Sequence, residues 1–191
     1  MAFAAVLDAN VLHPIGLTDF FLTLAGYDLY RPQWSTQILD EVRCNLLKQY
    51  PGITSDQLEY RSHEMNRAHP GALVDPPAAL ISVMTNHPKD RHVLATAIAT
   101  HASVIVTSNI KDFSVDACQL HGVEAQRPDV FAEHLVDLGP PAAARVLAEM
   151  SDRTQRPHYT IPAIFARLQQ DLPHTMERLG LFLGLPPTGP E

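Results

Sequence analysis

The first twelve residues constrain the fold most, because they join an apolar strand to a single carboxylate. The run MAFAAVL is apolar and stops at Asp8, and an amphipathic segment follows. An apolar run of this length is typical of a strand that is buried on both faces of a parallel sheet. The stretch therefore predicts a strand that delivers Asp8 to the carboxyl edge of a sheet, where ligands bind in open α/β folds.

Helical and strand-like segments alternate along the next hundred residues. The strands are expected at residues 29–35, 103–109 and 123–126, and the helices at 17–30, 36–50, 54–69, 88–102 and 129–138. Parallel strands need crossover connections, which are usually helices and are right-handed. The alternation predicts an α/β fold, a three-layer α/β/α sandwich around a central parallel sheet.

A break at Gly139, Pro140 and Pro141 separates this region from the rest of the chain. The remainder offers helical segments at 142–150, 161–172 and 175–183 and no strand, and it ends in the proline-rich LPPTGPE. We therefore expect one domain over residues 1–137 and a helical C-terminal extension over residues 140–191.

The composition limits the classes of function. A formal net charge of −7 argues against a protein coated with positive charge to grip nucleic acid. It does not exclude nucleic acid as a substrate, since a bound cation can hold a phosphate. No apolar run is long enough to cross a bilayer, and a signal peptide is absent, so we expect a cytoplasmic protein without membrane contact. Two cysteines, Cys44 and Cys118, are expected to be reduced.

Three further acids fall at boundaries of expected elements, as Asp8 does: Glu41, Asp90 and Asp112. Carboxylates that converge on one sheet edge repel one another unless a cation neutralises them. Oxygen ligands without histidine or cysteine at ligand spacing indicate Mg²⁺ or Mn²⁺ rather than zinc. Other roles are open for single residues, because an aspartate can be an N-cap and Glu41 can be an exposed helix charge.

Such a cation would orient and deprotonate a water for in-line attack on a phosphodiester. Four polar residues are expected to position water or phosphate oxygens at the same edge: Asn10, Thr107, Ser108 and Asn109. His92 follows Asp90 by two residues and is expected to have a packing or surface role. Trp34 is expected in the core.

These motifs carry a family resemblance. They are LDANVL with Asp8, ILDEV with Glu41, PKDRHVLATAI with Asp90, and IVTSNIKDF with Asn109 and Asp112. Together they resemble the PIN-domain ribonucleases, in particular the VapC-type toxins of bacterial toxin–antitoxin pairs, over residues 1–137. The resemblance implies a PIN-like sandwich, a Mg²⁺- or Mn²⁺-dependent endoribonuclease acting on RNA, a cognate antitoxin and a homodimer.

Matched residue by residue, Asp8, Glu41 and Asp90 occupy three of the family's acidic positions. Many members have an acid where this chain has Asn109, so either Asn109 ligates through a water or Asp112 substitutes for the acid. Two other functions stay open. One is a non-catalytic PIN-like module that binds RNA or protein. The other is an aspartyl-phosphate phosphotransferase, which would need an acid where Asn10 stands.

Overall fold

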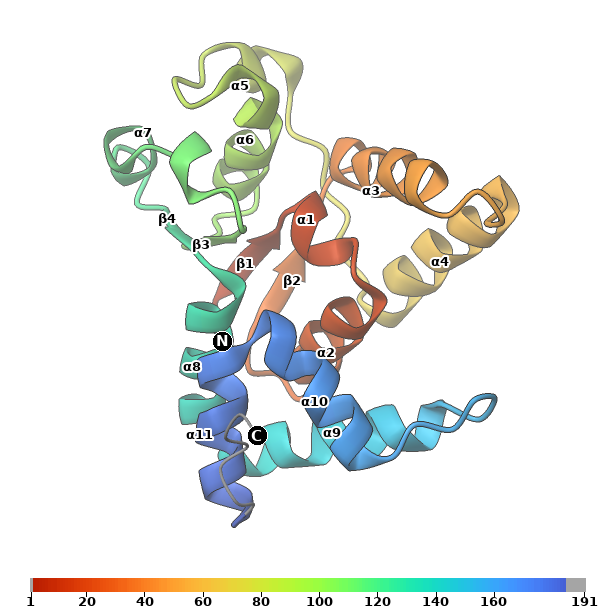
Figure 1. The fold of residues 1–191 in the computed structure, drawn as a ribbon. Coiled ribbons are helices and arrows are strands. Elements are labelled where there is room, and N and C mark those ends of the chain that lie inside the picture. The colour runs from red at the N-terminus through yellow and green to blue at the C-terminus, as the bar shows by residue number, and fades with distance from the viewer. Residues whose placement is uncertain (1, 185–191) are drawn as a thin grey trace. The chain divides into compact units, whose positions relative to one another are not determined.

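A four-stranded parallel sheet forms the centre of one of two units into which the chain divides (Figure 1). The computed structural model describes residues 2–184. The first unit holds the residues up to His13 and residues 30–127, and the second holds residues 14–29 and those from Pro128 onward. The predicted domain boundary at residues 137–140 stays a prediction, while the packing in the structure groups residues 14–29 and 128–137 with the C-terminal helices.

The sheet has the order β2-β1-β3-β4, with all neighbours parallel. The strands are β1 (Ala4–Leu7), β2 (Arg31–Gln33), β3 (Val104–Val106) and β4 (Glu124–Gln126). Every residue of β1 and β3 is buried, as the apolar runs predicted. In register, Leu7 of β1 lies opposite Val106 of β3, so both strands end at the same edge. The predicted α/β fold with a central parallel sheet is confirmed.

The helices of the first unit begin at polar caps or prolines. Ser35 accepts a hydrogen bond from the backbone of Ile38 at the start of α3, and Thr54 forms a capping box with Gln57 at the start of α4. Pro88 starts a 3-10 turn, Pro88–Asp90, that leads into α6. The helices are α1 (Ala9–Leu12), α3 (Thr36–Gln49), α4 (Ser55–Ala68), α5 (Ala78–Ser82), α6 (Arg91–Ala99) and α7 (Val115–Gln119).

Helix α6 packs against β1 and β3, and it buries the face that carries Val93, Leu94 and Ala97. Trp34 is fully buried, as predicted, and its indole N–H donates to the Asn66 side chain at 2.8 Å. Both cysteines are free thiols. Within residues 2–184, no helix has the length and apolar character that a membrane span needs.

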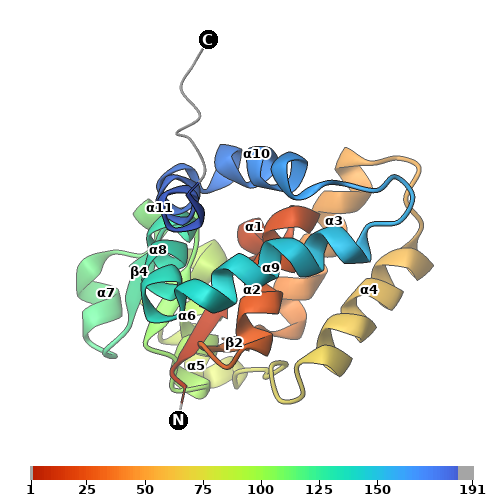
Figure 2. The ribbon, with the colours of Figure 1, turned by 90° about the horizontal axis from the view of Figure 1, so that it is seen from below.

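The second unit is helical. Its elements are α2 (Ile15–Gly26), α8 (Pro128–Leu138), α9 (Pro140–Arg153), α10 (Ile161–Asp171) and α11 (Pro173–Leu183). Helix α10 packs against α9, and α11 packs along α8 (Figure 2). Phe21 and Phe131 meet in the interior with ring centroids 5.7 Å apart, which joins α2 to α8. The C-terminal helices predicted from the sequence are therefore present.

Candidate metal centre

Asp8 lies where β1 ends and α1 begins, and only 2% of its surface is exposed. One carboxylate oxygen, Oδ1, accepts from the backbone N–H of Ala9 at 2.6 Å. The other, Oδ2, accepts from the Asn10 amide at 2.5 Å and the Thr107 hydroxyl at 2.7 Å. Asp8 thus caps α1, as one alternative predicted, and still has acceptor capacity on Oδ1.

The polar residues around Asp8 form a network that joins the ends of β1 and β3. Thr107 is fully buried, and its hydroxyl oxygen also accepts from the Asn10 amide and the backbone N–H of Asn109, both at 3.0 Å. The backbone N–H of Ser108 donates to the Asn10 side chain at 2.9 Å. The network holds the Asp8 carboxylate in one orientation. A role for its members in positioning water or phosphate stays a prediction.

Glu41 lies on α3, and its side chain is 40% exposed. The pKa of Glu41 is raised from 4.5 to about 7. Partial burial of the side chain is the largest cause, and the charges of Asp8 and Asp90 also contribute. Burial also raises the pKa of Asp8, and the negative charge of Asp90 raises it as well. The structure therefore brings these three acids close enough to repel one another, as their predicted convergence requires.

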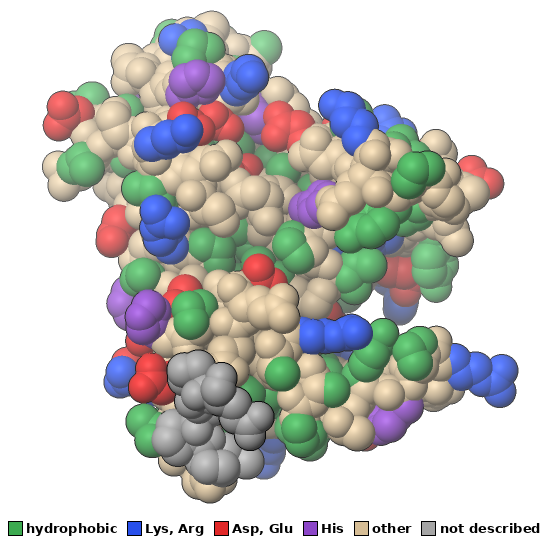
Figure 3. Space-filling view, viewed as in Figure 1, with side chains coloured by type: hydrophobic (Ala, Val, Ile, Leu, Met, Phe, Trp, Pro, Cys, Tyr) green, Lys and Arg blue, Asp and Glu red, His purple; other side chains and the backbone are tan. Residues whose placement is uncertain are grey.

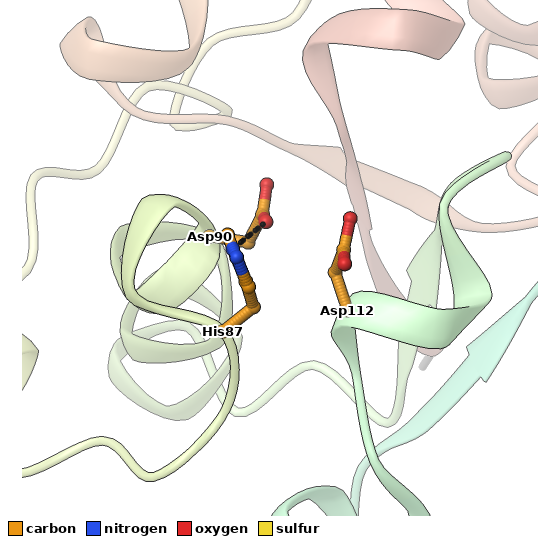
Figure 4. Close-up of side chains that lie close together, drawn as sticks. All are labelled: His87, Asp90 and Asp112. Carbon is orange, nitrogen blue, oxygen red and sulfur yellow. Dashed lines mark ion pairs between the residues drawn. The ribbon is translucent and has the colours of Figure 1, made fainter.

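A second group of side chains surrounds Asp90 (Figure 4). His87, Asp90 and Asp112 offer ligand atoms that all lie within 4.8 Å of one another, and His87 Nδ1 is 3.3 Å from Asp90 Oδ2. Asp112 comes from the 3-10 turn Ile110–Asp112, and its backbone carbonyl accepts from the N–H of His87 at 3.1 Å. The expectation that no histidine stands at ligand spacing is wrong, because the turn at Pro88 brings His87 back toward Asp90.

The electrostatics of this edge favour a cation. Burial and the charge of Asp112 raise the pKa of Asp90, so each added carboxylate makes the next harder to ionise. Among the residues that the structure describes, no lysine or arginine forms an ion pair with Asp8, Glu41, Asp90 or Asp112. Carboxylates with an adjacent imidazole are suitable donors for a divalent cation. The residues present therefore fit the metal that the resemblance implies.

His92 was not predicted to take part. It is 1% exposed on α6, and its Nε2 lies 3.4 Å from Glu41 Oε1. The sequence shows only that His92 follows Asp90 by two residues. Its approach to Glu41 depends on the packing of α6 against α3, which no local pattern specifies.

An open pocket of about 460 Å³ borders the network through Asn10, with His13, Asn45, Lys48 and Gln49 as its other lining residues. Figure 3 shows acidic side chains between α6 and α3 with lysine and arginine side chains on either side. Positive charge near an acidic centre can hold a phosphate backbone beside it.

Two comparisons with known proteins give matches. Residues 128–181, from α8 into α11, match the family model described as VapC50 C-terminal domain. A protein of Mycobacterium tuberculosis (strain ATCC 25618 / H37Rv) named "Putative ribonuclease VapC50" is 39% identical over 94 residues. That match covers 49% of this chain and 56% of the relative, so the chain spans little more than half the relative's length.

No solved structure matches the chain. The family model covers residues 128–181, which contain none of the four candidate acids. The resemblance to PIN-domain ribonucleases rests on the motifs that contain those acids. The two matches confirm the similarity of this chain to VapC-type PIN ribonucleases that carry a C-terminal extension.

Proposed function

We propose that this protein is a metal-dependent endoribonuclease that cleaves RNA phosphodiester bonds as the toxin of a toxin–antitoxin pair. The observation that carries the proposal is the cluster of acids at the carboxyl edge of the sheet, in which burial and neighbouring carboxylates raise the pKa values of Asp8, Glu41 and Asp90. The similarity to a protein named as a ribonuclease supports the same activity.

Asp8, Glu41, Asp90 and Asp112 would hold Mg²⁺ or Mn²⁺, which when bound supplies an activated water and stabilises charge on the phosphate. Asp112 is preferred to Asn109 as the fourth residue, because its carboxylate lies in the cluster with Asp90.

The chain's own groups have defined tasks in this proposal. Thr107 and Asn10 orient the Asp8 carboxylate by donating to Oδ2. Glu41, with a pKa of about 7 in the absence of a cation, would lose its proton near neutral pH when it binds the metal. Lys48, in the pocket that borders Asn10, would bind a phosphate of the RNA next to the cleaved bond.

We further propose the partners and location that accompany such toxins: an RNA substrate, a cognate antitoxin protein, a second copy of the chain in a homodimer, and the cytoplasm. These rest on the resemblance and on the name of the relative.

The test is cleavage of a labelled structured RNA by the purified chain in Mn²⁺ or Mg²⁺, with and without a chelator. Asp8→Asn and Asp90→Asn should reduce cleavage to background, because each removes a charge from the site. Asp116→Asn changes an exposed acid on α7 and should leave cleavage unchanged. Activity that survives the chelator or the site variants would refute the proposal. RNA that is bound but not cut by the unaltered chain would favour the non-catalytic module.

A further inference from the structure

One ring nitrogen of His92 is buried without a hydrogen-bond partner. His92 is 1% exposed, and within the described residues its Nε2 forms no hydrogen bond. A buried polar atom without a partner lowers the stability of the folded chain, so its position calls for an explanation. The Glu41 carboxylate lies beside this nitrogen, with Oε1 3.4 Å from Nε2.

The other ring nitrogen is satisfied. The ring hydrogen-bonds to the backbone of Lys89, and the donor is Nδ1 because Nε2 has no bond. In that tautomer Nε2 carries a lone pair that faces the Glu41 carboxylate.

Two lone-pair donors that face each other without a proton between them suit a cation. Ligand bonds of about 2.0–2.2 Å at right angles place neighbouring donor atoms about 3 Å apart. The separation of 3.4 Å between Nε2 and Oε1 is close to that value.

We propose that Nε2 of His92 is a ligand of the cation at Glu41, and that this nitrogen makes the site prefer Mn²⁺ to Mg²⁺. The inference rests on the proposed metal-dependent function and adds a residue to its site. Mg²⁺ is bound almost entirely by oxygen and water, whereas first-row transition cations accept imidazole readily. The site then differs in metal preference from one built of carboxylates alone.

A different arrangement would use the same geometry. If Glu41 keeps its proton, it donates to Nε2, and His92 is then a positioning residue that never touches the cation. The two arrangements differ in one observable, which is whether a histidine nitrogen is bonded to the metal.

The experiment uses the full chain, with Mn²⁺ and Mg²⁺ binding measured by calorimetry and ¹⁴N coupling to bound Mn²⁺ measured by pulsed electron paramagnetic resonance. His92→Gln places an amide near the former Nε2, and His92→Asn keeps a donor near Nδ1 but has no group that reaches Glu41. His87→Gln removes the other histidine beside Asp90, and His121→Gln changes an exposed histidine elsewhere in the first unit. Thermal melts without metal establish that each variant is folded.

We expect ¹⁴N coupling in the unaltered chain, in His87→Gln and in His121→Gln, and its loss in both His92 variants. Mn²⁺ affinity should fall at least about tenfold in His92→Asn, while His92→Gln restores part of it through an amide oxygen. The preference for Mn²⁺ over Mg²⁺ should fall in both.

Coupling that disappears in His87→Gln, or Mn²⁺ binding without any ¹⁴N coupling, would overturn the ligand role of His92 and leave the proposed nuclease function standing. An unaltered chain that binds neither cation would overturn both. Because the His87→Gln sample contains an intact His92, the result does not depend on the folding of the His92 variants.

Discussion

Replacement of Glu41 by glutamine should stabilise the protein when no metal is present. Burial, with the charges of Asp8 and Asp90, raises the pKa of Glu41 from 4.5 to about 7 in the folded state. The ionised side chain is therefore less favourable in the folded chain than in the unfolded chain. For a fully buried group such a shift corresponds to about 3 kcal/mol. The Glu41 side chain is 40% exposed, so solvent screening reduces the figure to about 1 kcal/mol.

The sign of the effect fixes its pH range. A raised folded-state pKa costs stability above the pKa of the unfolded state, and the cost is complete once the pH exceeds about 7. Glu41→Gln should therefore raise the melting temperature by about 2–4 °C at pH 8 and by much less near pH 4.5.

Circular dichroism melts of the chelated protein at the two pH values measure this difference. Glu59→Gln, a change of a glutamate on α4 whose side chain is 69% exposed, should shift the melt little at either pH. Added Mn²⁺ should then stabilise the unaltered chain more than Glu41→Gln, because ligand binding to the folded state adds stability. If the melting temperature of Glu41→Gln at pH 8 is equal to or below that of the unaltered chain, the inferred repulsion of Glu41 by Asp8 and Asp90 is refuted.

Three further outcomes are expected. Thr107→Val should lower the free energy of unfolding in urea by about 2 kcal/mol, since it removes a donor to Asp8 and the acceptor of the Asn109 N–H. Mn²⁺ affinity by calorimetry should rise with pH up to about pH 8 and then level, because Glu41 must lose its proton to bind, and Glu41→Gln should flatten this rise. In the second unit, Asp129→Ala should destabilise the start of α11 by about 1–2 kcal/mol in thermal melts, because Asp129 accepts from the N–H groups of His174 and Thr175.

Much of the sheet could be predicted because its signals are local. The apolar runs before Asp8 and Thr107 specify buried strands, and a strand that ends in a carboxylate places that carboxylate at the edge of the sheet. Ser35 and Thr54 cap the starts of α3 and α4, and both caps are visible in the sequence. For these strands and helix caps, where the signal is a residue and its near neighbours, the prediction and the structure agree.

The parts that could not be predicted depend on the type of one local turn and on distant contacts. Pro88 predicted a helix start, but the chain makes a 3-10 turn first, and that turn folds His87 back onto Asp90. The grouping of α2 with the C-terminal helices rests on contacts such as that of Phe21 with Phe131, which are 110 positions apart. The break at residues 139–141 suggested a different division of the chain. The periodicity of a segment shows that it has a buried face and does not show which segment covers it.

The candidate centre joins these two kinds of information. Asp8 could be placed from the sequence because its position follows from one strand. The proximity of Glu41 and His92, in contrast, depends on the packing of α3 against α6. The acids alone would suggest a site for a hard cation held by oxygen. The buried nitrogen beside Glu41 changes that expectation, because an imidazole nitrogen without a hydrogen-bond partner adds a donor that Mg²⁺ seldom uses. In the proposed centre the preference for one metal therefore depends on a contact between two helices, and a nitrogen-sensitive measurement on bound Mn²⁺ tests that contact directly.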